Sequence, residues 1–145
     1  MPPDTRLLQQ KYGDNTLEEL ANAVSMVESS GGKNATPRYE PGFQKRYLQG
    51  KPQWEQLAKQ YGWQAVSSSY GPYQIMFPTA VDLGFKGTPQ QLADPVINRQ
   101  YFDKKFTKDF AKTGNVQMAL LRYNGGGNPN YPNLVMSYLP KKRGK

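Results

Sequence analysis

The sequence predicts a mainly α-helical single domain, spanning residues 1–145, with at most a small β element. A chain of 145 residues suits one hydrophobic core. Its apolar residues recur mostly at helical spacing between glycine and proline stops. Ten Tyr, six Phe and two Trp bring large apolar surfaces to that core. We find no internal repeat and no interdomain linker, and we expect any sheet within residues 38–76.

The first helix is expected over residues 17–29, after a loose lead-in at 1–14. Thr16 and Glu19 form the pattern of a capping box, in which each residue satisfies a backbone N–H of the other. Two glycines then stop the helix at 31–32. The apolar residues that follow helical spacing are Leu17, Leu20, Val24 and Val27.

The middle of the chain reads as short helices around an irregular segment. A helix begins at Pro52 and ends before Gly62. The run "SSSYGPYQI" at 67–75 favours a loop or a short extended piece. Short helices are expected in "FPTAVDLG" (77–84) and "TPQQLAD" (88–94).

Longer helices fill the C-terminal part. One is capped by Asp94 and presents three phenylalanines on one core-facing stripe. The next begins at Asn115 and stops at Gly125, and "NLVMSYL" closes the fold before a basic tail at 141–145. The stripe is formed by Phe102, Phe106 and Phe110.

Composition excludes several kinds of chemistry. The chain has no Cys and no His, so thiolate catalysis, disulfides and histidine bases are absent. Acid–base chemistry must therefore use a carboxylate, a tyrosine or a lysine. We expect no metal and no cofactor. There is no apolar run that could span a membrane and no signal-peptide pattern, and the net charge of +8 favours an anionic polymer as partner.

Elimination among the eleven carboxylates leaves Glu28 and Glu40 as candidates. Glu28 lies in the last helical turn beside the apolar stripe, where desolvation and the helix dipole both raise a carboxyl pKa. A side chain that bends out to water is the alternative. For Glu40 we favour the alternative, a loop residue paired with Arg38 or Lys45. Of the other carboxylates, Glu18 and Glu19 lie in a first helical turn and Asp94 is a cap. Glu55 is expected to pair with Lys51 or Lys59, and Asp103 and Asp109 lie with Lys104, Lys105, Lys108 and Lys112 on a predicted solvated helix face.

Three motifs, taken together, resemble a known family. "ESSGG" (28–32), "GPYQI" (71–75) and "RYNGG" (122–126) occur in the order of the E-S, G-L-M-Q-I and A-Y-N-A-G motifs of lytic transglycosylase (SLT-type) domains, relatives of goose-type lysozyme. The resemblance spans roughly residues 16–139. It implies an α+β lysozyme-like fold with a sugar-binding cleft, and cleavage of the β-1,4 bond between N-acetylmuramic acid and N-acetylglucosamine in peptidoglycan.

The resemblance also implies roles for individual residues. Glu28 matches the single catalytic acid/base, whose reaction leaves a 1,6-anhydro end, and Tyr123 matches the tyrosine beside it. The motif positions expected to line the substrate are Ser29, Gly71, Gln74, Ile75 and Asn124. From side-chain chemistry we add Ser69 for hydrogen bonding, Tyr73 and Tyr131 for stacking on sugars, and Glu40 as a second carboxylate.

The chain departs from the family pattern at several positions. Pro72 and Tyr73 stand where Leu and Met are usual, and Arg122 and Gly125 replace small alanines. The interval between the first two motifs is longer than in typical members. Its extra segment, which includes residues 38–50 and 52–62, could form a cleft wall or a partner surface.

Three alternatives remain open from the sequence. The enzyme could be a hydrolytic muramidase assisted by Glu40 or water. The fold could serve as a non-catalytic wall-binding or virion structural module. The charge also suits a nucleic-acid binder, although no known binding motif groups the basic residues. We expect a monomer that acts on glycan strands of the cell wall, in the periplasm or outside the cell, without nucleic acid, as a bacterial protein, a phage endolysin or a virion enzyme.

Overall fold

A computed structural model describes residues 10–141 of the protein. Helices dominate it and two small sheets complete it, which confirms the predicted α+β lysozyme-like fold. The longer helices are α2 (Leu17–Ser29), α4 (Pro52–Tyr61), α7 (Pro95–Thr113) and α8 (Val116–Tyr123). The shorter ones are α3 (Pro41–Phe43), η1 (Gln44–Leu48), α5 (Trp63–Val66), α6 (Phe77–Asp82), η2 (Gln90–Ala93) and α9 (Tyr131–Met136).

The larger sheet is antiparallel, with strand order β3-β4-β5, and falls within the predicted segment. Its strands are β3 (Arg38–Tyr39), β4 (Ser68–Tyr70) and β5 (Ile75–Met76). Arg38 pairs with Ser69, which in turn pairs with Met76. The sheet therefore brings the extra segment beside the second motif.

A second sheet corrects the prediction that residues 1–14 are loose and that strands are confined to 38–76. β1 (Lys11–Tyr12) and β2 (Asn15–Thr16) form an antiparallel hairpin whose turn holds Gly13 at φ +63°. Tyr12 is buried and packs edge-on against Phe106 and Phe110. The rest of the predicted lead-in, and the basic tail after Lys141, lie outside the described residues.

Helix α2 begins and ends where the sequence predicts. Thr16 Oγ1 accepts the backbone N–H of Glu19, and Glu19 Oε1 accepts that of Thr16, so the capping box is confirmed. Ser30 ends the helix in the left-handed region at φ +52°, with its N–H bonded to the carbonyl of Met26. The helix thus stops immediately after Glu28 and Ser29.

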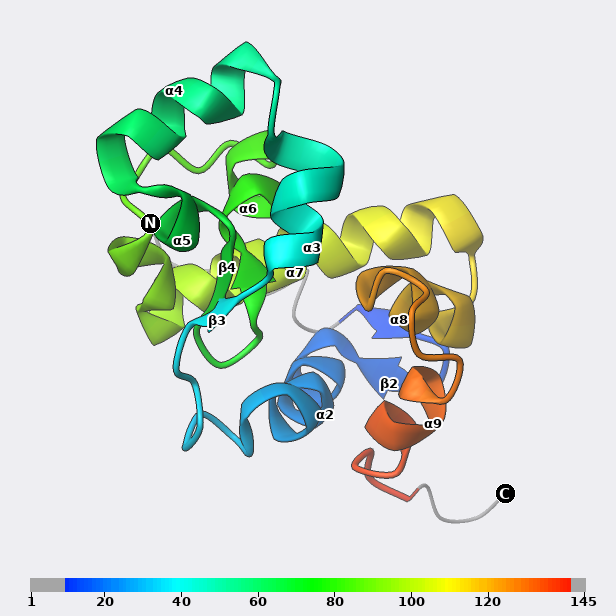
Figure 1. The fold of residues 1–145 in the computed structure, drawn as a ribbon. Helices are drawn as coiled ribbons and strands as arrows, with labels where there is room; N and C mark the ends of the chain where they lie inside the picture. Colours follow the sequence, from blue (N-terminus) through cyan, green and yellow to red (C-terminus); the bar gives the residue numbers. More distant parts are fainter. Residues whose placement is uncertain (1–9, 142–145) are drawn as a thin grey trace.

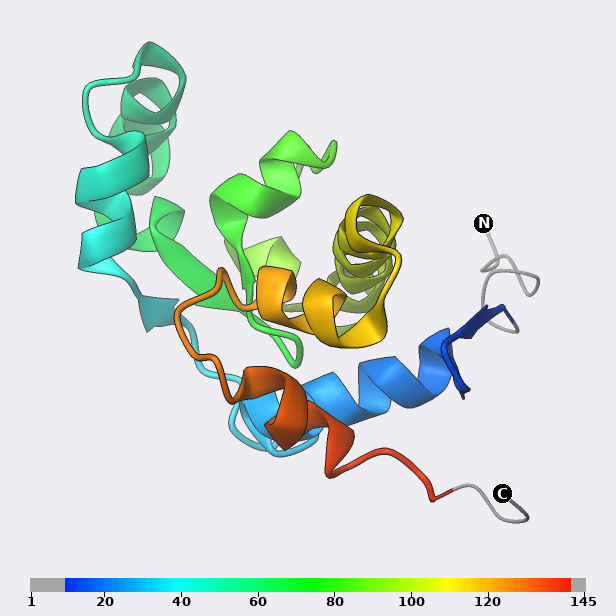
Figure 2. The same cartoon turned by 90° about the vertical axis from the view of Figure 1, so that its right-hand side faces the viewer.

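The core forms around α7, which packs against α8, α2 and β5. Phe102 and Phe106 are fully buried, and Phe110 lies partly buried beside them, as the stripe predicts. In Figures 1 and 2, α3 to α6 and the larger sheet lie on one side of the molecule, and α2, α8 and α9 lie on the other. Within residues 10–141, no helix is both long and apolar enough to cross a membrane.

Candidate active site

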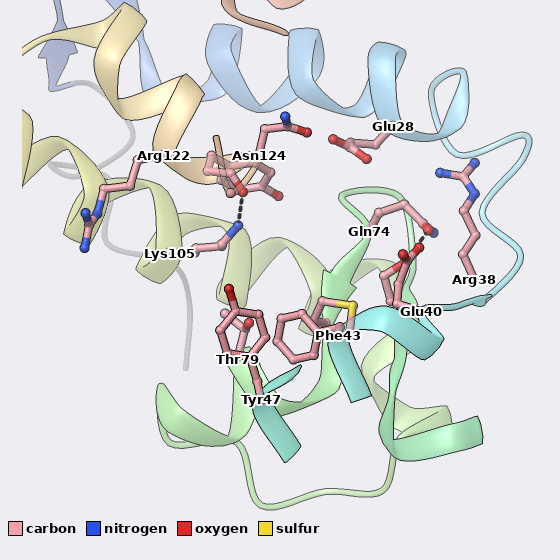
Figure 3. Close-up of a pocket in the computed structure, with 14 residues that line it drawn as sticks. Glu28, Arg38, Glu40, Phe43, Tyr47, Gln74, Thr79, Lys105, Arg122 and Asn124 are labelled. Atoms are coloured by element: carbon pink, nitrogen blue, oxygen red, sulfur yellow. Dashed lines mark hydrogen bonds between the residues drawn. The ribbon is translucent and has the colours of Figure 1, made fainter. Parts of the chain in front are cut away.

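An open pocket of about 520 Å³ lies between these two groups of elements. Figure 3 shows Glu28 projecting into it from α2, opposite the β3–η1 segment, with Lys105 and Asn124 on the α7–α8 side. Residues from all three sequence motifs therefore meet at one place. The lining residues are Glu28, Arg38, Glu40, Phe43, Tyr47, Ser69, Gln74, Met76, Thr79, Lys105, Arg122, Tyr123, Asn124 and Gly125.

Glu28 is half-buried, and burial raises its pKa above the ordinary value of 4.5. A hydrogen bond from Tyr131 and the charges of Lys105 and Arg38 act in the opposite direction but do not cancel the effect of burial. The side chain thus faces the pocket rather than bulk water. Its environment favours the protonated carboxyl that a general acid requires.

Tyr131 is the direct partner of Glu28. Its hydroxyl donates a 2.6 Å hydrogen bond to Glu28 Oε2, and its ring stacks on that of Tyr123 at 6.5 Å between centroids. The tyrosine is only 3% exposed, which corrects the prediction that it stacks on sugar faces. α9 positions it, because Asn130, Tyr131 and Pro132 begin that helix against α2 and α8.

Tyr123 lines the pocket but bonds elsewhere. Its hydroxyl donates a 2.8 Å hydrogen bond to the carbonyl of Tyr73, so the structure gives it no bond to Glu28. Burial, followed by the charges around it, raises its pKa well above the ordinary value, which keeps the phenol neutral. Tyr123 therefore ties the third motif to the second.

The loop of the second motif is held by buried Asn98. Its Oδ1 accepts the N–H of Tyr73, and its Nδ2 donates to the carbonyls of Tyr70 and Leu92, each at 2.8 Å. Gly71 has φ +78°, and a Cβ there would lie 2.4 Å from the Asn98 side chain. The loop needs glycine for both reasons.

Gln74 comes from the same loop and presents its amide to the pocket. It adopts φ +48°, and its Oε1 accepts the Ser69 hydroxyl at 2.7 Å while its Nε2 donates to the carbonyl of Gly71 at 2.9 Å. These bonds orient both side chains before any ligand arrives. Ser69 and Gln74 both line the pocket, and their contact with substrate stays a prediction.

Ser29 joins the first motif to the second from a buried position. Its hydroxyl donates to the carbonyl of Pro72 at 2.7 Å and accepts the N–H of Gly32 at 2.9 Å. The residue therefore fixes the end of α2 against the loop instead of facing the pocket. Three other residues predicted to contact substrate, Gly71, Tyr73 and Ile75, are also buried and do not line this pocket.

Glu40 does line the pocket, as a second carboxylate would. Its side chain is exposed, and within residues 10–141 it makes no ion pair with Arg38 or Lys45. The expected pairing is therefore wrong. Glu40 lies at the β3–α3 junction, where its N–H bonds to the carbonyl of Ser67.

Lys105 is a pocket residue that the sequence analysis placed on a solvated helix face. Its ammonium donates to the carbonyl of Tyr123 and lies 3.7 Å from the centre of that ring. Burial lowers its pKa to about 8, against the opposing charges of Asp109 and Glu28. Lys105 follows Phe102 by three residues and so lies beside the core stripe on the helix surface. This spacing could have predicted its burial.

Asp103 and Asp109 correct the same prediction. Asp103 bonds to Arg99 at 2.8 Å, and Asp109, only 7% exposed, bonds to Arg122 at 3.2 Å. Glu55 likewise accepts the N–H of Gly50 instead of pairing with a lysine of its helix. Within the described part of the chain, no cluster of three acidic side chains could hold a metal ion.

Comparison with known families identifies the chain. The family model "Transglycosylase SLT domain" matches residues 7–137, so the protein belongs to the SLT transglycosylase domain family. Membership implies cleavage of glycosidic bonds in peptidoglycan and hence action on the cell wall. Comparisons with the curated proteins and with the solved structures gave no match.

Proposed function

We propose that the protein is a lytic transglycosylase in which Glu28 is the single catalytic acid/base. One observation carries the proposal: a half-buried carboxyl whose pKa is raised faces a pocket lined by all three motifs. Protonated Glu28 would donate its proton to the oxygen of the bond between N-acetylmuramic acid and N-acetylglucosamine. Bond cleavage then leaves Glu28 ionised.

The second step uses that carboxylate as a base. It takes the proton of the muramic acid C6 hydroxyl, whose oxygen attacks C1 and closes a 1,6-anhydro ring, which restores protonated Glu28. The hydrogen bond from Tyr131 supports this step because it stabilises the ionised form between the two proton transfers. Neutral Tyr123 is proposed as a catalytic neighbour that shapes the wall beside Glu28.

Substrate binding would use polar groups fixed beside Glu28. Gln74, Ser69 and Asn124 line the pocket and carry amides or a hydroxyl suited to the acetamido groups of the glycan. Ser29 supports these contacts indirectly through Pro72. Phe43 and Tyr47 offer aromatic surface on the opposite wall.

Mass analysis of peptidoglycan digests tests this proposal. The parent should release products with anhydro ends, and Glu28→Gln should release none while binding the polymer and keeping its melting temperature. Asp14→Asn, which removes one exposed carboxylate from the β1–β2 turn, outside the pocket lining, is the matched control and should behave as the parent. Equal activity of the parent and Glu28→Gln would refute the proposal, and inactivity of both would favour a wall-binding module.

A hydrolytic muramidase is the second candidate, because Glu40, which pairs with no cation in the described part of the chain, lines the same pocket as Glu28. Such an enzyme would use a second carboxylate to activate water and would leave a hydrated reducing end. Glu40→Gln separates the two reactions. A hydrolase would lose most of its activity, whereas a transglycosylase with one acid/base would keep its anhydro products.

A further inference from the structure

A second pocket of about 510 Å³ adjoins the first, between the end of α7 and α8. Arg122 and Gly125 line both pockets, so the two spaces are contiguous at the third motif. These are the two positions at which the chain departs from the small alanines of the family motif. The remaining lining includes Asp109, Thr113 and Met118.

Arg122 is oriented at this junction by one ion pair. Its Nε donates to Asp109 Oδ1 at 3.2 Å, and its side chain remains 48% exposed. Within residues 10–141, no other hydrogen bond reaches the guanidinium, so both terminal nitrogens are open to a ligand. Figure 3 shows Arg122 on the side of Glu28 opposite Arg38.

The surroundings of Arg122 carry an excess of positive charge. Lys105, Lys108 and Arg122 all act on the carboxylate of Asp109, and Lys105 also interacts with Glu28, so three cations lie near two carboxyl groups. A planar guanidinium with two free nitrogens recognises a carboxylate through two parallel hydrogen bonds. The loop beside it leaves room, because nothing lies within 4 Å of a Cβ placed on Gly125 or Gly126.

We propose that Arg122 and the adjoining pocket bind a carboxylate of the peptide stem that muramic acid carries. The inference rests on the proposed function, which places muramic acid next to Glu28. A stem peptide extends about 3.3 Å per residue, so a few residues suffice to leave the sugar pocket. Arg122 is therefore a specificity-determining residue that favours glycan strands still bearing their peptides.

The experiment compares two substrates, glycan strands with intact stems and the same strands stripped of peptides by an amidase and then amidated at the lactyl carboxylate that this hydrolysis exposes on muramic acid. For Arg122→Ala, which restores the residue of the family motif, the ratio of kcat/KM for stem-bearing to stripped strands should fall about tenfold. Arg122→Lys keeps the positive charge but loses the planar guanidinium that can form two parallel hydrogen bonds, so it should give an intermediate ratio. Lys59→Ala removes one exposed cation from α4 and should leave the ratio unchanged.

A binding measurement with a catalytically inactive variant tests the inference independently of catalysis. In the Glu28→Gln background, adding Arg122→Ala should weaken sedimentation with stem-bearing strands more than with stripped strands. An unchanged selectivity ratio in both Arg122 variants, together with equal binding losses on the two polymers, would overturn the inference. Failure of the parent to cleave either substrate would instead contradict the proposed function, and the binding measurement would still decide the role of Arg122.

Discussion

The hydroxyl of Tyr131 lies 2.6 Å from Glu28 Oε2, although 103 residues separate the two along the chain. Because the phenol has a strongly raised pKa, it stays protonated and donates its proton in this bond. Glu28 is thus held by a neutral donor within a half-buried site. The contact lowers the carboxyl pKa while burial raises it, so the two effects oppose each other at one group, and burial is the larger.

Replacing Tyr131 with phenylalanine tests this balance. The variant loses the donor and keeps the stacked ring, so the pKa of Glu28 should rise further. A higher pKa keeps the acid protonated to higher pH, and the alkaline limb of the kcat/KM profile should move upward. The carboxylate formed during the reaction also loses a hydrogen bond of about 1.5–3 kcal/mol, so kcat should fall about tenfold or more.

Tyr138→Phe is the control for that substitution, because Tyr138 is 52% exposed and lies outside the pocket. It should leave both the rate and the pH profile of the parent unchanged. A Tyr131→Phe enzyme with an unmoved alkaline limb would show that the hydrogen bond does not influence the proton of Glu28.

The loop of the second motif should be intolerant of a Cβ at Gly71. Gly71→Ala places a methyl group against Asn98 in a left-handed residue, whereas Gly50→Ala has φ +85° and open space. Both variants pay about 1–2 kcal/mol for the backbone conformation. Only Gly71→Ala adds overpacking, so its free energy of unfolding should be lower by a further 1 kcal/mol or more, of the order of overpacking costs.

Urea denaturation measures this difference at fixed temperature and pH. Equal midpoints for Gly71→Ala and Gly50→Ala would mean that Asn98 yields without cost, and that the three hydrogen bonds it makes are not essential to the loop.

Lys105 should leave a signature in the pH dependence of stability. Its pKa falls from 10.5 in an exposed lysine to about 8 in the folded protein. Between these values the unfolded chain binds more protons than the folded one, so this group makes stability increase with pH over roughly pH 8–10. Below pH 8 both states carry the proton and the contribution is constant.

The measurement is the stability of the parent minus that of Lys105→Met across this range. The difference should rise with pH, because the variant lacks only the ammonium of residue 105 and shares every other titrating group with the parent. Lys104→Met, one residue away and exposed, should parallel the parent. A flat difference for Lys105→Met would mean that the ammonium is solvated and has no low pKa.

The sequence predicted those parts of the fold that depend on local pattern. The capping box of Thr16 and Glu19 begins α2, and the phenylalanine stripe of α7 is buried, because both signals lie within one or a few helical turns. The placement of Glu28 in the last turn of α2 was predicted from the pattern of that helix and from the first motif. The β1–β2 hairpin was missed because strands of two residues have too little alternation to detect.

Partners that are distant in sequence were not predictable in this way. Tyr131 read as a sugar contact, because nothing near it in the chain indicates that α9 packs beside α2. Lys105 and Asp109 were predicted to be solvated charges. Asp109 is buried and Lys105 partly buried because α8 packs over their side of α7, and the sequence of α7 alone does not show this contact. The Arg122–Asp109 pair became visible only once these two helices were placed together.

The chemistry finally depends on whether Glu28 holds its proton at a higher pH than an ordinary glutamate. A carbon-13 titration of the free enzyme reports this, with the Glu28 carboxyl signal assigned by its disappearance in Glu28→Gln. We predict a midpoint above 4.5 that coincides with the alkaline limb of the kcat/KM profile. A midpoint at or below 4.5, as in a solvated carboxylate, would contradict acid catalysis by this residue.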